Sequence, residues 1–98
     1  VPAGIYYLST RGGQASMRVE GKEFIVEQGS HCLPCEKDWM PEARRTAVIE
    51  DGILRREVRC GSPTTAGWVV LGRSNNGWTE WKNAEGKPIT VYRTSADS

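Results

Sequence analysis

The sequence predicts one α+β domain, in which two short helices pack against a small, mostly antiparallel sheet of about five to six strands. The 98 residues are 38% hydrophobic and 26% charged, a balance that suits a single folded core. The first third alternates apolar and polar residues with the period of half-buried strands. Two later segments carry helix start and stop signals, which gives the element order βββ-α-β-α-ββ.

The N-terminal third is predicted to form three antiparallel strands. Residues 5–8 are rich in β-forming side chains, and residues 11–14 contain a glycine pair typical of a turn. Residues 15–20 alternate apolar and polar side chains, so one face of this strand is expected to be buried. A turn at residues 20–22 leads into the apolar run 24–26, which completes the meander.

The middle of the chain is predicted to hold an irregular loop, a helix and a strand. The loop covers residues 30–40, and the helix runs from Pro41, which suits a first helical position, to Gly52, which can end it in the left-handed conformation. Residues 53–60 follow as the strand.

A second helix begins clearly at Ser62-Pro63, since a hydroxyl cap precedes a proline where no N–H is needed. It is expected to end at Gly72. Gly67 inside this helix costs about 0.5–1 kcal/mol relative to alanine, so we expect a close contact on its face.

The C-terminal quarter is predicted to form a final hairpin. Residues 75–77 are a strong turn signal, and residues 78–82 and 89–92 are expected to be strands around a turn at 84–86. Residues 94–98 are expected to be a loose tail.

The net charge of +1 conceals an asymmetry along the chain. Residues 1–43 carry four basic and six acidic side chains, net −2, whereas residues 44–93 carry nine basic and five acidic ones, net +4. The C-terminal half could therefore present a positive face to phosphates. Because the excess is small, binding from charge alone would be weak and sensitive to salt.

Several features exclude classes of protein. The longest apolar stretch, residues 66–71, is far short of the ~20 residues that cross a bilayer, so we expect no membrane span. Residues 1–4 contain no basic region before an apolar run, so we expect no signal peptide. Three cysteines cannot all pair within one chain. A reducing, cytoplasmic location is the simpler expectation.

Four blocks in order carry a resemblance: Glu-Phe-Ile-Val-x-x-Gly-Ser at residues 23–30, Ile-Glu-Asp-Gly-Ile-Leu at 49–54, Ser-Pro-x-x-Ala at 62–66, and Val-Leu-Gly-Arg-Ser-x-Asn-Gly-x-x-x-Trp-Lys at 70–82, closing on Gly86. Over roughly residues 20–90 the chain resembles the bacterial domain of unknown function 4357 family, found at the C-termini of GIY-YIG nuclease-like and restriction–modification-associated proteins. More loosely, it is similar to the module associated with restriction enzymes and adenine methylases. The resemblance implies a small accessory domain in DNA-processing systems, without catalytic residues. For the related methylase-associated module it implies reading of DNA or of methylated bases.

The sequence also offers a set of candidate DNA contacts. An indole can stack on a base, an asparagine can pair with adenine, and arginine or lysine can hold phosphates. The alternative interpretation is structural, with a turn at the asparagines, core tryptophans at Trp78 or Trp81, and an ordinary solvated face at the arginines. The candidate nucleic-acid-binding residues are Arg73, Asn75, Asn76, Trp78, Lys82, Arg55, Arg56 and Arg59.

Two motifs suggest chemistry that we do not favour. Gly4-Ile5-Tyr6 matches half of the GIY-YIG nuclease signature, but the other half is absent from the sequence. Cys32 and Cys35 have zinc-ligand spacing, with His31 and Cys60 as possible further ligands, yet there is no second close pair. Two thiols in a loop are the preferred interpretation.

The sequence therefore predicts a non-catalytic accessory module of a DNA-processing or restriction–modification-type protein, without a cofactor and not at a membrane, that contacts DNA, plain or modified, weakly through its C-terminal half. An alternative is a protein–protein docking module that positions a nuclease or methylase, a catalytic domain of the same or a neighbouring protein. It predicts an exposed apolar patch and binding that survives high salt. A further alternative is a structural domain stapled by zinc at Cys32, Cys35 and Cys60.

Overall fold

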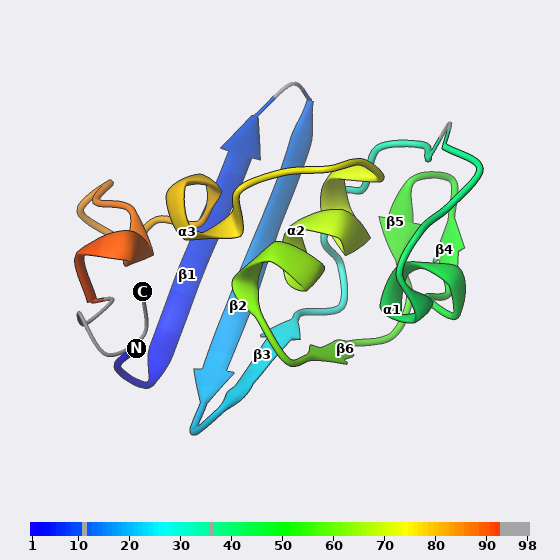
Figure 1. Ribbon diagram of the computed structural model, residues 1–98. Coiled ribbons are helices and arrows are strands. Elements are labelled where there is room, and N and C mark those ends of the chain that lie inside the picture. Colours follow the sequence, from blue (N-terminus) through cyan, green and yellow to red (C-terminus); the bar gives the residue numbers. More distant parts are fainter. Residues whose placement is uncertain (11, 36, 93–98) are drawn as a thin grey trace.

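A four-stranded antiparallel sheet in the order β1-β2-β3-β6 forms the centre of the molecule (Figure 1). The computed structural model describes residues 1–10, 12–35 and 37–92. A second sheet of two short strands, β4 and β5, lies beside it, and three short helices complete the α+β fold that the sequence predicts. The predicted loose tail, residues 94–98, lies outside the described residues.

The predicted three-stranded meander is confirmed. β1 (Gly4–Thr10), β2 (Gly13–Glu20) and β3 (Glu23–Val26) pair antiparallel. The short β2–β3 turn requires a positive φ, which Gly21 adopts at 61° without the penalty of a Cβ atom. β6 (Val58–Cys60) pairs with β3 on the side away from β2 and forms the last strand of the sheet.

Helix α2 (Pro63–Leu71) packs across one face of this sheet, as Figure 1 shows. The Ser62 hydroxyl accepts a hydrogen bond from the Thr65 N–H, and Gly72 ends the helix with φ 66°, so both predicted caps are present. Beneath α2, alternate residues of the strands and the residues on the inner face of the helix form one buried cluster. Its members include Leu8, Met17, Val19, Val26, Leu54, Ala66, Val69, Val70, Trp81 and Ile89.

The predicted helix from Pro41 to Gly52 is wrong beyond its first turn. Helix α1 spans Glu42–Arg45, and β4 (Ile49–Glu50) then pairs with β5 (Ile53–Leu54) in a hairpin. The turn residues Asp51 and Gly52 have φ values of 53° and 77°, the pair of positive angles that an Asp-Gly hairpin turn needs. Their turn preference outweighs the helical spacing. The predicted strand 53–60 is also interrupted, since residues 55–57 are irregular and separate β5 from β6.

The predicted C-terminal hairpin is also wrong, although its turn at residues 84–86 is present. The Asn76 side chain accepts a hydrogen bond from the Trp78 N–H and so caps α3 (Gly77–Glu80), where the sequence predicts a turn and a strand. Residues Ile89–Tyr92 form the 3₁₀ helix η1. Of the expected strand pairing, an isolated bridge between Lys82 and Pro88 remains, and Lys82 bridges to Tyr7 on its other side.

Within residues 1–10, 12–35 and 37–92, the longest helix is α2, and no helix has the length and apolar character that a bilayer crossing demands.

Candidate nucleic-acid interface

The residues expected to contact DNA are spread over the fold. Arg55 and Arg56 lie between β5 and β6, Arg73 follows the end of α2, and Lys82 pairs with β1. Figure 1 places β5 and β1 on opposite sides of α2. The structure therefore does not bring these cations together in one groove among the described residues.

Asn75 has a structural role in the space beside α2. Its Nδ2 donates hydrogen bonds to the carbonyl oxygens of Thr64 at 3.3 Å and Arg73 at 3.0 Å. Its buried Oδ1 lies against Gly67, where a Cβ atom would come within 2.1 Å of it. This is the close contact that a glycine inside a short helix predicts, and it directs the Asn75 amide inward.

Asn76 and the two neighbouring tryptophans are also engaged by the fold. Asn76 caps α3, as described above, and Trp78 is half-buried against the core. Trp81 is fully buried, and its indole N–H donates to the Pro63 carbonyl oxygen at 3.0 Å. The core interpretation of Trp81 is confirmed.

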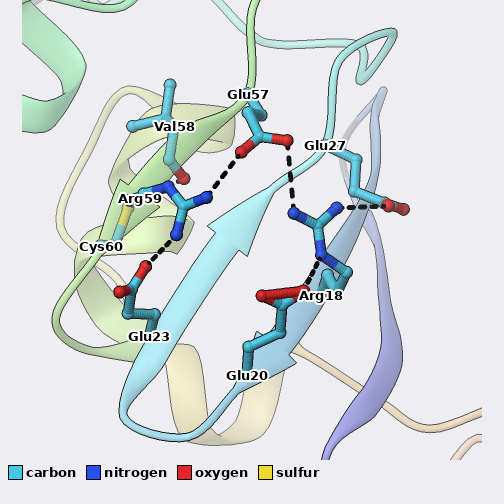
Figure 2. A network of polar contacts seen from close by, with 8 residues as sticks. All are labelled: Arg18, Glu20, Glu23, Glu27, Glu57, Val58, Arg59 and Cys60. Carbon is cyan, nitrogen blue, oxygen red and sulfur yellow. Dashed lines mark hydrogen bonds and ion pairs between the residues drawn. The ribbon is translucent and has the colours of Figure 1, made fainter.

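Arg59 belongs to a network of ion pairs on the sheet face opposite α2 (Figure 2). Its guanidinium pairs with Glu23 at the start of β3 and with Glu57 at 3.5 Å. The same Glu57 pairs with Arg18 of β2 at 3.3 Å, so one carboxylate bridges two arginines. Arg18 also contacts Glu20 at 2.7 Å and Glu27 at 3.4 Å. The hydrogen bonds that Arg18 donates to Glu20 and Glu57 raise its pKa, and the hydrogen bond that Arg59 donates to Glu23 raises the pKa of Arg59.

The network covers an apolar residue. Ile25 stands directly between Arg18 and Arg59 in the strand register and is 0% exposed, although it lies outside the main buried cluster. The aliphatic stems of the two arginines can cover Ile25 while their charged ends remain in water. With four glutamates to two arginines, this part of the face is acidic and would repel phosphate.

The other predicted cations differ from Arg59. Arg55, Arg56 and Lys82 are exposed, and Arg73 is half-exposed. In the part of the chain that the structure describes, no ion pair joins any of these four to a carboxylate. Arg73 shares a small hollow at the C-terminal end of α2 with Lys37. These cations keep their charge available to an anion.

One exposed aromatic residue on the open face of the sheet was missed as a candidate. Tyr6 of the Gly-Ile-Tyr triplet points into the core, where its hydroxyl donates to the Pro2 carbonyl oxygen, and burial raises its pKa. The next residue, Tyr7, points the other way and is 47% exposed. The alternation of residues 5–8 was the signal that could have found it, since neighbours in a strand face opposite sides.

Tyr7 stands between two shallow hollows, which we call the Tyr7 hollows. The first, of about 460 Å³, is formed with Ser9, Lys82, Asn83, Ala84 and Gly86. The second, of about 310 Å³, is formed with residues of β2 and of the segment after β3, including Gln14, Ser16, Gln28 and His31. Both volumes fall in the range of small-ligand sites, about 300–1,000 Å³.

The cysteine loop packs on the C-terminal end of α2. The Leu33 N–H donates to the Val70 carbonyl oxygen at 2.7 Å. The Arg44 guanidinium donates to the carbonyl oxygens of Val69 at 2.6 Å and Leu33 at 2.9 Å. The bonds to Val69 and Val70 satisfy carbonyls that the end of a helix leaves without a partner. The loop is thus part of the scaffold.

Two of the three thiols, those of Cys32 and Cys60, are buried and are poor ligands. Burial raises the pKa of Cys60 to about 12, and burial raises the pKa of Cys32 despite an opposing effect of Arg44. The thiolate, which binds metal or attacks a disulfide, is therefore scarce at neutral pH. Among the described residues, no three His, Cys, Asp or Glu side chains are grouped to hold a metal ion, so the zinc alternative has no ligand set there.

The chain was compared with models of known protein families. A family model described as a domain of unknown function, DUF4357, matches residues 6–93. No curated protein and no solved structure matches the chain.

Proposed function

This chain belongs to the DUF4357 family of domains of unknown function, and from that premise we propose that it is a non-catalytic accessory module of a DNA-processing or restriction–modification-type protein. Its role is to contact DNA weakly and hold it near a catalytic domain of the same or a neighbouring protein. The resemblance described above supports the DNA-processing context.

One observation carries the proposal of DNA contact. Within the described residues, Arg55, Arg56, Arg73 and Lys82 have no carboxylate partner, whereas Arg59 and Arg18 are neutralised by glutamates. Accessible, unpaired cations displace the counterions condensed on DNA when they neutralise its phosphates, and this release drives weak, salt-dependent binding. We assign phosphate contact to these four cations at separate places on the surface, with Arg55 and Arg56 adjacent, and withdraw Arg59, whose charge is already satisfied by Glu23 and Glu57.

The test is a titration of labelled duplex DNA, plain and adenine-methylated, at low salt (about 50 mM) with the salt dependence of binding measured. Arg55→Gln and Arg56→Gln are each expected to weaken binding and to lower the slope of log K against log salt by about 0.9. Lys22→Gln removes one exposed charge from the β2–β3 turn and is the charge-matched control. The proposal fails if no duplex binds at about 100 μM protein, the weak end of non-specific affinities, or if all three variants behave alike.

A second candidate function, protein docking, is favoured by Trp39. Its indole is 67% exposed and stands edge-on to that of Trp68, with ring centroids 5.5 Å apart. Exposed tryptophans held in place are frequent energetic centres of protein interfaces. If docking is the function, binding to the catalytic domain of the parent protein persists at high salt and Trp39→Ala weakens it, while Arg56→Gln does not.

A further inference from the structure

We propose that the open sheet face at Tyr7 binds an unpaired base of single-stranded nucleic acid, with Lys82 holding an adjacent phosphate. The inference rests on the proposed nucleic-acid contact and names the form of nucleic acid that this surface fits. It concerns a surface other than the one that Arg55 and Arg56 provide.

The backbone places the aromatic ring and the cation side by side. The Tyr7 N–H donates to the Lys82 carbonyl oxygen at 2.7 Å, and the Lys82 N–H donates to the Tyr7 carbonyl oxygen at 2.8 Å. On its other side, Tyr7 is the register partner of Ser16. Residues directly opposite in antiparallel pairing share a face of the sheet, so Lys82, Tyr7 and Ser16 form a row across the bridged segment at residue 82, β1 and β2.

The residues beside this row confirm its orientation. Tyr6 and Leu8 flank Tyr7 in β1 and are buried, and Trp81 precedes Lys82 and is buried as well. Since successive side chains alternate between faces, Tyr7 and Lys82 both point away from the core. The ring of Tyr7 therefore has apolar support behind its strand and an open side toward the solvent.

The hollows provide room for a base on the ring. They lie on either side of Tyr7, and the second contains a bridge in which His31 faces Gln14. No side-chain hydrogen bond engages Gln14 or Gln28 within the described residues, so both amides can pair with base edges. Asn83 cannot contribute in this way, because its side chain already bonds Tyr92 and the backbone N–H groups of Glu85 and Lys87.

The charge of the surface selects an anionic ligand with a flat apolar part. Among the described residues, neither hollow is lined by an acidic one, and Glu27, which precedes Gln28 beside the second hollow, is paired with Arg18 at 3.4 Å. An aromatic ring beside a cation on an open sheet is the arrangement that stacks one base and neutralises its phosphate. Duplex bases are stacked on one another and present no face to such a ring, so the ligand is a single strand.

The experiment measures the affinity of the full chain for labelled oligonucleotides of about ten nucleotides, a length that covers one binding site. The probes are oligo-dT, oligo-rU and an abasic strand with the same phosphates, at low salt. Because Tyr7 is exposed, Tyr7→Ala is expected to fold, which its melting temperature checks. Tyr7→Phe retains the ring, and Val91→Ala, another exposed apolar position, is the control.

Tyr7→Ala is expected to weaken oligo-dT binding by about 5- to 150-fold, whereas Tyr7→Phe stays within about twofold of the unmodified chain. The abasic strand is expected to bind weakly and to ignore the Tyr7→Ala change. Lys82→Gln is expected to lower the salt slope for the single strand by about 0.7. The ratio of oligo-dT to oligo-rU affinity tells whether DNA or RNA is the preferred strand.

Oligo-dT binding that is equal in Tyr7→Ala and the unmodified chain overturns the inference, as does equal affinity for the abasic strand. Duplex binding that still depends on Arg56 in that case leaves the proposed function in place. If neither duplex nor single strand binds at about 100 μM, both fail.

Discussion

Gly67 offers a direct test of how closely α2 packs on the segment that follows it. A Cβ atom at residue 67 would lie 2.1 Å from Asn75 Oδ1, 2.7 Å from Cγ and 2.9 Å from Nδ2. A Cβ atom does not make non-bonded contacts this short, so Gly67→Ala must displace the Asn75 side chain. Displacement breaks its hydrogen bonds to the carbonyl oxygens of Thr64 and Arg73.

Two effects of opposite sign decide the result. Alanine is favoured over glycine in a helix by about 1 kcal/mol. Against this, forcing a Cβ into a packed site costs about 1–3 kcal/mol, and each lost hydrogen bond about 0.5–1.5 kcal/mol. We therefore expect Gly67→Ala to lower the free energy of unfolding by roughly 2–4 kcal/mol. For a chain of this length each kcal/mol corresponds to about 4–8 °C in melting temperature.

Urea unfolding of a double-mutant cycle isolates the contact. Asn75→Ala alone loses two hydrogen bonds, but it opens the space that a methyl group at residue 67 needs. The double variant Gly67→Ala/Asn75→Ala is expected to be more stable than the sum of the single effects predicts, by about 2 kcal/mol. Gly61→Ala, where a Cβ meets nothing within 4 Å, is the control and should change little. Stabilisation by Gly67→Ala, or additivity in the cycle, would refute the reasoning.

Three further changes test other parts of the scaffold. Gly77→Ala places a Cβ 2.2 Å from the backbone carbonyl of Pro63, which no side-chain movement relieves, so urea unfolding should show a larger loss than for Gly67→Ala. Arg44→Met removes the donor to the helix-end carbonyl of Val69 and to the loop carbonyl of Leu33, and should cost about 2–4 kcal/mol in the same assay, with Arg45→Met as the exposed control. Burial raises the pKa of Cys60 to about 12 in the folded chain, so the thiol ionises at lower pH in the unfolded chain than in the folded one. The free energy of unfolding should therefore fall as the pH rises above about 9. Denaturant midpoints between about pH 8 and 11 should fall less steeply in Cys60→Val, and an unchanged slope would contradict the burial effect.

The elements that the sequence predicts correctly are those in which every local pattern favours the same structure. The strand at residues 15–20 has strict alternation, and α2 has a serine cap, a first-turn proline and a left-handed glycine at its end. The errors occur where two signals compete. At Asp51-Gly52 a hairpin turn outweighs helical spacing, and at Asn76 a helix cap is mistaken for a turn because the same side chain suits both.

The candidate site is harder to predict because its members meet only through pairing between distant strands. The sequence suggests Lys82 through its neighbours along the chain, yet its contact is with Tyr7, which lies in the first strand. No local pattern reveals that pairing. Asn75 is a candidate for its ability to pair with adenine, but its amide is needed by the backbone beside Gly67, a contact that only the packing of α2 determines.

The charge asymmetry along the chain shows why half-chain totals are a poor guide to a binding surface. Arg59 comes from the basic half, but β3–β6 pairing sets it beside Glu23 from the acidic half, and Glu57 links it to Arg18. One cation of the basic half is thus paired with carboxylates within the sheet, where its stem helps to cover Ile25. Lys82 also comes from the basic half, but it bridges to Tyr7 of β1. Among the described residues, no acidic side chain lines the hollows there. A cation acts on a ligand according to the residues that surround it in space, and on this sheet those surroundings favour the Tyr7 side over the Arg59 side.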